Sequence, residues 1–233
     1  MPKQKAALFW SGGKDSAFAL YSIQKNYPEL EIILLITTVN QEFKRISMHG
    51  VREELLNKQA ESIRISLQKM QVPNEPSNRA YEKELHHTLA KVKASGIDLI
   101  VFGDIFLEDL KEYRDNILKT HGLSGIYPLW KKDTSVLIQD FISSGFRTMI
   151  CCINNASLPK SWLGREIDQN FIDDLPKGID PCGENGEFHT FCFEGPIFNQ
   201  SIDIITGEEK FVPFNIKTDP SEKQTGFWYI DLY

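Results

Sequence analysis

The stretch that decides the fold is Ala6-Ala7-Leu8-Phe9-Trp10-Ser11-Gly12-Gly13-Lys14-Asp15-Ser16, an apolar run followed by a glycine-rich turn. A continuous apolar run bounded by a lysine and by glycines predicts a buried strand. The residues after the turn are helix formers with apolar side chains at 17, 20 and 23, which predicts a helix ending near Asn26. A second apolar run over 31–39 completes a strand–turn–helix–strand unit with parallel strands.

The same alternation continues to residue 153. Helices are predicted over 51–70, 80–95, 107–120 and 134–144, and strands over 98–104, 127–130 and 146–153. About five repeats of strand and helix are typical of an α/β fold with a doubly wound parallel sheet. We therefore expect residues 1–153 to form one domain.

After residue 153 the composition of the sequence changes. Residues 154–187 are rich in Gly, Pro, Asp and Asn, and short strands are predicted over 188–193, 201–206, 208–214 and 227–232. Gly207 lies between two of these segments and predicts a hairpin there. Residues 154–233 are therefore expected to form a small α+β portion packed on the first domain.

Composition and charge exclude several classes of protein. The chain has 233 residues, 41% of them hydrophobic and 25% charged, with a net charge of −6. An acidic chain argues against a protein that grips nucleic acid through a basic face. No apolar run approaches the ~20 residues of a membrane span, and we expect neither a membrane nor a nucleic-acid partner.

Cysteine usage points to a reduced compartment. The four cysteines form no CxxC pair, which argues against a zinc ribbon and against a thioredoxin-type redox pair. The adjacent pair Cys151 and Cys152 ends a predicted strand and is expected in the core, whereas Cys182 lies nearer the candidate site. We expect cytoplasmic localisation.

The turn at Ser11–Ser16 has the chemistry of an anion site. Two glycines allow a tight turn that exposes successive N–H groups, and the N-terminus of the following helix adds free donors and partial positive charge. Lys14 can neutralise phosphate, and the hydroxyls of Ser11 and Ser16 can donate to phosphate oxygens. Asp15 can cap the helix or hold Mg²⁺. The alternative is an ordinary strand-to-helix turn with simple caps.

The six residues SGGKDS match neither GxxxxGK[ST] nor GxGxxG. They resemble the SGGxDS loop of the PP-loop ATP pyrophosphatases. That resemblance implies cleavage of ATP between the α- and β-phosphates, adenylation of an acceptor, and Mg²⁺ bridging the phosphates. The protein's work would be positioning and charge neutralisation.

A second informative segment is DPCGENGEFHTF, residues 180–191. It places two carboxylates, an amide and an imidazole within six residues: Glu184, Asn185, Glu187 and His189. Both glutamates flank a turn and can point into one cleft. A glycine-rich turn with solvated glutamates is the alternative.

Three features together resemble the diphthine–ammonia ligase family over nearly the whole chain. They are SGGKDS at 11–16, SWLGR at 161–165, and GENGEFHTF at 183–191 followed by Gly195 and Pro196. The resemblance implies that ATP activates a carboxylate, that ammonia displaces AMP, and that an amide forms. In archaea and eukaryotes the carboxylate belongs to diphthine on elongation factor 2; in a bacterium the same chemistry would serve another carboxylate.

The resemblance also implies residue roles. Catalytic roles fall to Lys14, Asp15, Glu184, Glu187 and His189. ATP phosphates would be bound by Ser11, Gly12, Gly13, Lys14, Asp15 and Ser16, with Asp15 on the metal. The acceptor or ammonia side would be lined by Glu184, Asn185, Glu187 and His189. A wall of the cleft would be formed by Trp162, Gly164 and Arg165.

Other candidates follow from position in the predicted sheet. Gly103 and Asp104 end a central strand, where open α/β sheets bind ligands, although Asp104 could simply cap a helix. Thr37 and Thr38 end the second strand, where the superfamily forms part of its adenine pocket. His49 is expected to face nucleotide or substrate. Arg114 is an anion clamp or a solvated helix charge.

The sequence thus favours an AMP-forming amide ligase that uses ATP and Mg²⁺. A tRNA base-modifying enzyme is disfavoured by the lack of CxxC pairs and of a basic face. A nucleotide-binding regulator without turnover is the third alternative. A homodimer is among the assemblies that the sequence leaves open.

Overall fold

The computed structural model describes residues 2–46, 49–73, 78–214 and 224–233. Its first sheet joins five parallel strands in the order β4-β2-β1-β5-β6. These strands are β1 (Gln4–Phe9), β2 (Leu30–Asn40), β4 (Ser66–Val72), β5 (Leu99–Val101) and β6 (Ser124–Ile126). The short β3 (Arg45–Ile46) pairs antiparallel with the end of β2. The chain therefore forms the predicted α/β sheet.

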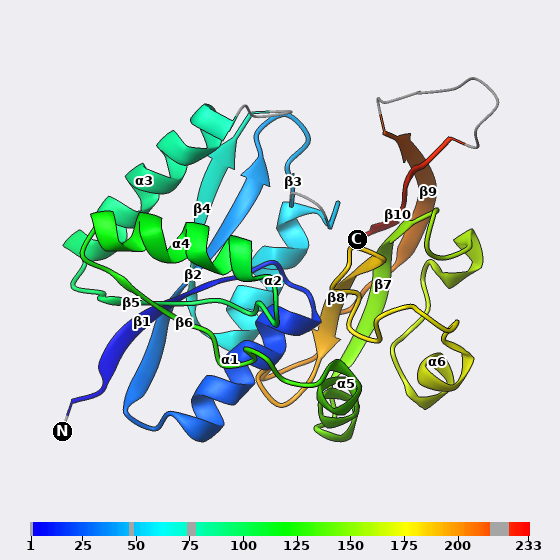
Figure 1. Ribbon diagram of the computed structural model, residues 1–233, viewed down its shortest axis with the longest axis horizontal. Coiled ribbons are helices and arrows are strands. Elements are labelled where there is room, and N and C mark those ends of the chain that lie inside the picture. The colour runs from blue at the N-terminus through cyan, green and yellow to red at the C-terminus, as the bar shows by residue number, and fades with distance from the viewer. Residues whose placement is uncertain (1, 47–48, 74–77, 215–223) are drawn as a thin grey trace.

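Helices cover both faces of this sheet (Figure 1). One face packs on α3 (Asn78–Ala94) and α4 (Glu108–Thr120) through a core that includes Ile36, Leu89 and Leu118. The other face packs on α1 (Lys14–Asn26) and α2 (Glu53–Ile63). Crossovers on both faces make the sheet doubly wound, as the alternation of elements predicts.

A second, antiparallel sheet lies beyond α1 and α2 in the order β8-β7-β10-β9 (Figure 1). Its strands are β7 (Arg147–Asn154), β8 (Phe188–Glu194), β9 (Thr206–Pro213) and β10 (Gly226–Leu232). Between β7 and β8 come the 3-10 helix η1 (Lys160–Trp162) and α6 (Gln169–Asp174), and α5 (Thr134–Ser143) precedes β7. One hydrophobic core runs from α1 and α2 through α5 into this sheet, so the second sheet buries its inner face against the first unit.

The predicted helix over 51–70 is wrong in its second half. The helix ends at Ile63, where Arg64 takes a left-handed φ of 63°. Residues 66–72 then form β4, which pairs with β2 from Leu34 to Asn40. The apolar residues of this stretch recur at intervals that suit a helix, but edge pairing with β2 satisfies a whole ladder of backbone groups and decides the outcome.

Three strand predictions also need correction. The strand expected at 127–130 lies instead at 124–126, and 127–130 is a turn. The strand expected at 146–153 exists as β7, but it belongs to the antiparallel sheet. No strand forms over 201–205, and β9 continues through Gly207 to pair with β10, so the hairpin predicted at Gly207 is wrong.

Candidate functional site

The candidate site lies where the winding of the parallel sheet changes direction. β1 and β5 are neighbours, yet the connection after β1 crosses one face of the sheet and that after β5 crosses the other (Figure 1). Ser11–Ser16 leaves the carboxyl end of β1, and Gly103 follows the end of β5. Ligands of open α/β sheets bind at such a switch point, so the predicted loop stands at the expected place.

Close contacts fix the shape of the loop. Gly12 has a φ of +80°, and a Cβ there would lie 2.7 Å from Gln59 Oε1. A Cβ on Gly13 would lie 2.8 Å from His49 Cε1 and 2.9 Å from the Thr190 carbonyl oxygen. Both glycines are therefore required by backbone conformation or by space.

The two loops at the switch point touch each other at Gly103. A Cβ on Gly103 would lie 2.9 Å from the carbonyl carbon and oxygen of Asp15. We expect Gly103→Ala to push the first turn of α1 away and to weaken binding of ATP by about 10-fold or more, since displaced backbone donors lose their alignment. Gly145→Ala is a control for backbone strain alone, because Gly145 has a φ of +82° but open space around its Cβ.

Titration calorimetry with a non-hydrolysable ATP analogue measures this effect. Thermal unfolding of both variants separates loss of binding from loss of folding. Equal affinity of Gly103→Ala and wild type would contradict the role given to this contact.

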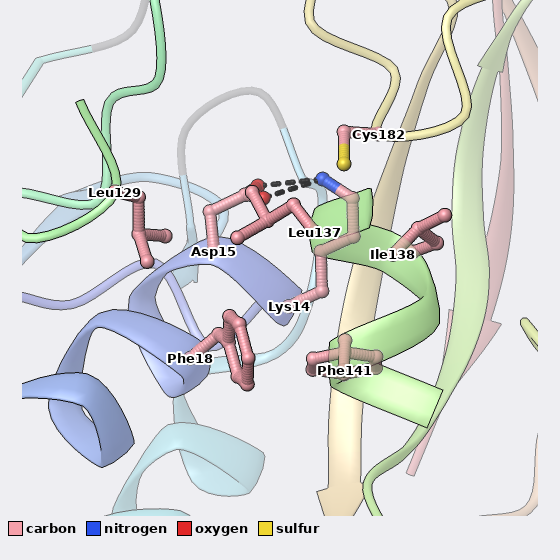
Figure 2. A pocket seen from close by; sticks show the side chains of 8 residues that line it. All are labelled: Lys14, Asp15, Phe18, Leu129, Leu137, Ile138, Phe141 and Cys182. Carbon is pink, nitrogen blue, oxygen red and sulfur yellow. Dashed lines mark hydrogen bonds and ion pairs between the residues drawn. The ribbon is translucent and has the colours of Figure 1, made fainter. Parts of the chain in front are cut away.

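Lys14 and Asp15 form an ion pair at the start of α1. Lys14 Nζ donates to both carboxylate oxygens of Asp15, at 2.6 and 2.8 Å, and the lysine is only 4% exposed. Figure 2 shows the ammonium between the Asp15 carboxylate and the Cys182 sulfur. Burial lowers the pKa of Lys14, but Asp15, Cys182 and Glu184 together raise it by more, so the net pKa shift is upward. The ammonium is a fixed positive charge beside the loop.

A mostly apolar hollow adjoins this pair, with Cys182 and six residues of α1 and α5 among its walls (Figure 2). The full lining is Lys14, Asp15, Phe18, Leu129, Leu137, Ile138, Phe141 and Cys182. Apolar walls exclude water and strengthen the interaction of the lysine with any anion held there.

The segment 180–187 folds over the loop through two acids. Asp180 accepts from the Thr134 hydroxyl at 2.7 Å and from the Cys182 amide at 2.8 Å. Glu187 is buried, and its carboxylate accepts from the amide of Asp180 at 3.1 Å and from the backbone and side-chain nitrogens of Asn185 at 2.9 and 3.1 Å. Both carboxylates thus have partners within the turn.

Glu184 differs from its neighbour Glu187. The Glu184 carboxyl group accepts a backbone hydrogen bond from Ile105, which lowers its pKa, but burial is the larger effect and raises the pKa of Glu184 to about 7. Asp15 and Asp180 raise this pKa further, whereas Lys14 lowers it. A carboxyl group that titrates near neutral pH beside a fixed ammonium is suited to acid–base chemistry.

Two imidazoles lie on the other side of the loop. His49 Nδ1 is 2.9 Å from the Thr190 carbonyl oxygen, so this nitrogen carries the proton. The His49 and His189 ring centroids are 4.8 Å apart. Burial lowers the pKa of both rings, that of His189 to about 3, so both are neutral at pH 7. His189 Nε2 is buried and has no hydrogen-bond partner in the described part of the chain.

The structure places the SWLGR residues at a distance from Lys14. Trp162 packs edge-on against Phe171, which packs against Phe188, and Lys14 Nζ lies 5.9 Å from the Phe188 ring. Arg165 stacks on Trp162 at 4.3 Å and donates to Asp174. Gly164 continues this segment with a φ of +80°. This segment supports the ring cluster beneath Lys14.

The remaining predicted site residues lie around the sheet. Asp104 and Arg114 are ion-paired, and the guanidinium carbon of Arg114 is 4.5 Å from the Phe102 ring centroid. Thr37 is buried in β2, and its hydroxyl has no partner within the described residues; Thr38 is half-buried. Asn185 is exposed apart from its contacts with Glu187.

Three residues were missed by the sequence predictions. Gln59 is fully buried, accepts from Trp10 Nε1 at 2.8 Å, and donates to the Gly12 carbonyl at 3.0 Å. Thr190 accepts from the Lys14 amide through Oγ1 at 3.0 Å. Asp180 organises the turn before Glu184. Of these three residues, only Gln59 is marked in the sequence, as a lone amide among the apolar positions of a predicted helix.

The residues that the structure describes include no group of three or more His, Cys, Asp or Glu side chains able to hold a metal ion. None of the described helices is long and apolar enough to cross a bilayer.

A glycine-rich loop and a buried lysine at a switch point define an α/β protein built to hold an anionic ligand. Models of two protein domains match this chain: the diphthamide synthase N-terminal domain over residues 4–125 and the diphthamide synthase C-terminal domain over 133–218. The first match covers more than half of the 233 residues. The chain therefore belongs to the diphthamide synthase family, as its motifs predict.

Curated relatives are consistent with this membership. The human diphthine–ammonia ligase is 26% identical over 225 residues, covering 88% of this chain and 84% of the human protein. The bovine diphthine–ammonia ligase is 31% identical over 133 residues, covering 54% of this chain and 49% of that protein. The fission yeast diphthine–ammonia ligase is 24% identical over 85% of this chain, which spans only 36% of the yeast protein.

One solved structure was also matched. The U34-tRNA thiolase NcsA from Methanococcus maripaludis, solved with its 4Fe-4S cluster, aligns with a TM-score of 0.40 and 16% identity. The alignment covers 61% of this chain and 58% of the thiolase.

Proposed function

We propose that this protein is an ATP-dependent ligase that adenylates a carboxylate, releases pyrophosphate, and forms an amide with ammonia. The observation that carries the proposal is the buried Lys14 ammonium at the start of α1, within the loop that its family and sequence motif associate with ATP. The curated relatives named diphthine–ammonia ligase support the reaction class.

The first step joins an oxygen of the acceptor carboxylate to the α-phosphorus and breaks the bond to the β-phosphate oxygen. Amides of the loop and Lys14 would hold the departing pyrophosphate, because developing negative charge meets donors that are already in place. In the second step the nitrogen of ammonia attacks the acyl carbon, AMP leaves, and a proton is lost from nitrogen. Glu184 would accept that proton.

Asp15 is the residue that would hold Mg²⁺. Magnesium sites of nucleotide enzymes use one or two carboxylates plus substrate phosphates rather than a protein cage, and Asp15 is a carboxylate at the loop with 31% of its side chain exposed. The donor set therefore fits the ion. Mg²⁺ would neutralise phosphate charge at that position.

The acceptor belongs to the proposal only as a class. The carboxylate is that of diphthine on elongation factor 2, or another carboxylate where diphthamide is not made. Residues 1–153 would serve ATP and 154–233 the acceptor. Cytoplasmic location, the absence of a nucleic-acid partner and a homodimeric state stay predictions.

Sulfur transfer to a tRNA base is the disfavoured alternative. It would require a reactive thiolate, whereas all four cysteines are buried and burial raises the pKa of every thiol. A regulator without turnover is distinguished by experiment.

The test is incubation with ATP, ammonium and candidate carboxylates, followed by separation of nucleotides. We expect AMP and pyrophosphate in equal amounts, formed only when ATP and a carboxylate are both present. Accumulation of ADP and phosphate would contradict the proposal. Tight ATP binding without AMP would indicate the regulator.

A further inference from the structure

A salt-bridge cluster joins β3 and the start of α2 to β10. The Asp231 carboxylate accepts from Arg52 Nε at 3.0 Å and Nη2 at 2.6 Å, and Arg45 Nη2 lies 2.9 Å from the same carboxylate. Arg45 belongs to β3 and Arg52 precedes α2. Asp231 belongs to β10, which lies beyond residue 218, where the second family model ends.

The alternation of β10 directs this carboxylate. Side chains two residues apart in a strand lie on one face, so Asp231 shares the face of Tyr229. The register of β10 against β9 shifts between Ile230 and Leu232, where two residues of β9, Gly207 and Glu208, lie opposite the single Asp231. Asp231 reaches two guanidinium groups with only 18% of its side chain exposed.

Residues on the two sides of His49 bond to one another. Ile46 donates to the Val51 carbonyl at 2.8 Å, and Arg45 Nη1 donates to the Gly50 carbonyl at 2.7 Å. Gly50, with a φ of +67°, lies flat on Tyr229 of β10, where a Cβ would be 2.6 Å from the ring. The two arginines and Gly50 are thus anchored to β10 on both sides of His49.

His49 is the residue through which these contacts reach the nucleotide loop. Its Nδ1 donates to the Thr190 carbonyl oxygen at 2.9 Å, and its ring lies against Gly13 of the loop. The charged groups that act on the ring are Lys14 and Asp15, and the neutral ring of His189 lies beside it. Any movement of Gly50 or Arg52 would be transmitted to this contact.

We infer that Asp231 is a positioning residue for the ligase reaction: by clamping Arg45 and Arg52 onto β10 it holds His49 against the ATP-binding loop. The inference rests on the proposed function for its kinetic consequence. Removal of the carboxylate charge breaks the ion pairs that tie both guanidinium groups to β10, and Arg45 keeps the Gly50 carbonyl as an acceptor. Loss of the His49 contact then loosens the loop that must align ATP.

The test compares Asp231→Asn with Asp231→Glu and with Asp98→Asn, which removes an exposed pair with Lys93 elsewhere in the fold. We expect Asp231→Asn to lower the rate of AMP formation by roughly 10- to 100-fold at temperatures far below unfolding. Asp231→Glu should recover most of it and Asp98→Asn should equal wild type. In a His49→Ala background Asp231→Asn should cost nothing further.

A second measurement does not depend on turnover. NMR titration of the His49 imidazole should show its lowered pKa moving up toward the ordinary value in Asp231→Asn and unchanged in Asp98→Asn, because the ring leaves its buried position. If wild type forms no AMP, the proposed function fails while this measurement still decides the role of Asp231. Should Asp231→Asn fail to fold, Arg45→Ala carries the same two measurements. Unchanged turnover and an unchanged His49 titration in a folded variant would overturn the inference.

Discussion

Replacing Lys14 with alanine is expected to lower AMP formation by about 10²- to 10³-fold, the usual cost of removing one preorganised group from developing charge. Its ammonium is almost completely buried and lies 2.6 Å from Asp15. A mobile surface lysine could not replace a charge that needs no reorganisation during the reaction.

Pyrophosphate release under saturating ATP measures this effect. Lys93→Ala is the matched control, because it also removes a lysine that pairs with an aspartate at 2.6 Å, but at an exposed position. Lys14→Arg should recover little activity, since a planar guanidinium does not fit the space of a compact ammonium. A rate within threefold of wild type for a folded Lys14→Ala variant would contradict the role of Lys14.

The local part of the site could be predicted because its signal is local. The loop over Ser11–Ser16 combines a strand, two glycines and a helix start within about twenty residues, and backbone geometry leaves few alternatives to such a pattern. Gly103 was found by the same logic, since its position after a buried strand follows from the parallel topology. Neither inference needed a contact between distant segments.

Long-range contacts explain what the sequence did not reveal. Gln59 reaches Gly12 across 47 positions of sequence, and Thr190 reaches Lys14 across 176. The division of 51–70 into α2 and β4 likewise depends on pairing with β2. A pattern of apolar residues records burial but not the partner, so such contacts are set only once the tertiary fold exists.

The two glutamates of the GENGEF segment illustrate the same limit at one site. Sequence treats Glu184 and Glu187 alike, as acids flanking a turn. In the structure Glu187 accepts three hydrogen bonds that shape the turn. Glu184 instead has a pKa of about 7, which nearby Lys14 lowers and burial raises. The catalytic role predicted for Glu187 therefore stays a prediction, with a structural role now visible beside it.

The second large effect is expected from Glu184 and from pH. Burial raises the pKa of Glu184 to about 7 from its ordinary value of 4.5, so its carboxylate form appears only as pH rises through 7. If the carboxylate accepts a proton from the attacking nitrogen, the rate should fall about tenfold per pH unit below 7 and level off above it. Glu184→Gln should lose about 10²- to 10⁴-fold and flatten this limb.

The profile must be measured at a constant concentration of neutral ammonia, because ammonia itself is protonated as pH falls. Glu61→Gln is the control, since it makes the same chemical change on an exposed face of α2. It should keep both the rate and the limb of wild type. A limb that persists unchanged in Glu184→Gln would assign the titration to another group.

Equilibrium unfolding provides a check that involves no catalysis. A carboxyl group whose pKa is higher in the folded than in the unfolded state contributes stability below pH 4.5, and that contribution is lost as pH rises through 7. Glutamine stays neutral throughout, like the protonated acid. The free energy of unfolding of Glu184→Gln should therefore rise relative to wild type between pH 4.5 and 8, and the rise should be complete where the kinetic limb levels off. A rise that is complete where the kinetic limb levels off would show that one buried carboxyl group governs both, whereas a rise already complete far below pH 7 would separate Glu184 from the catalytic titration.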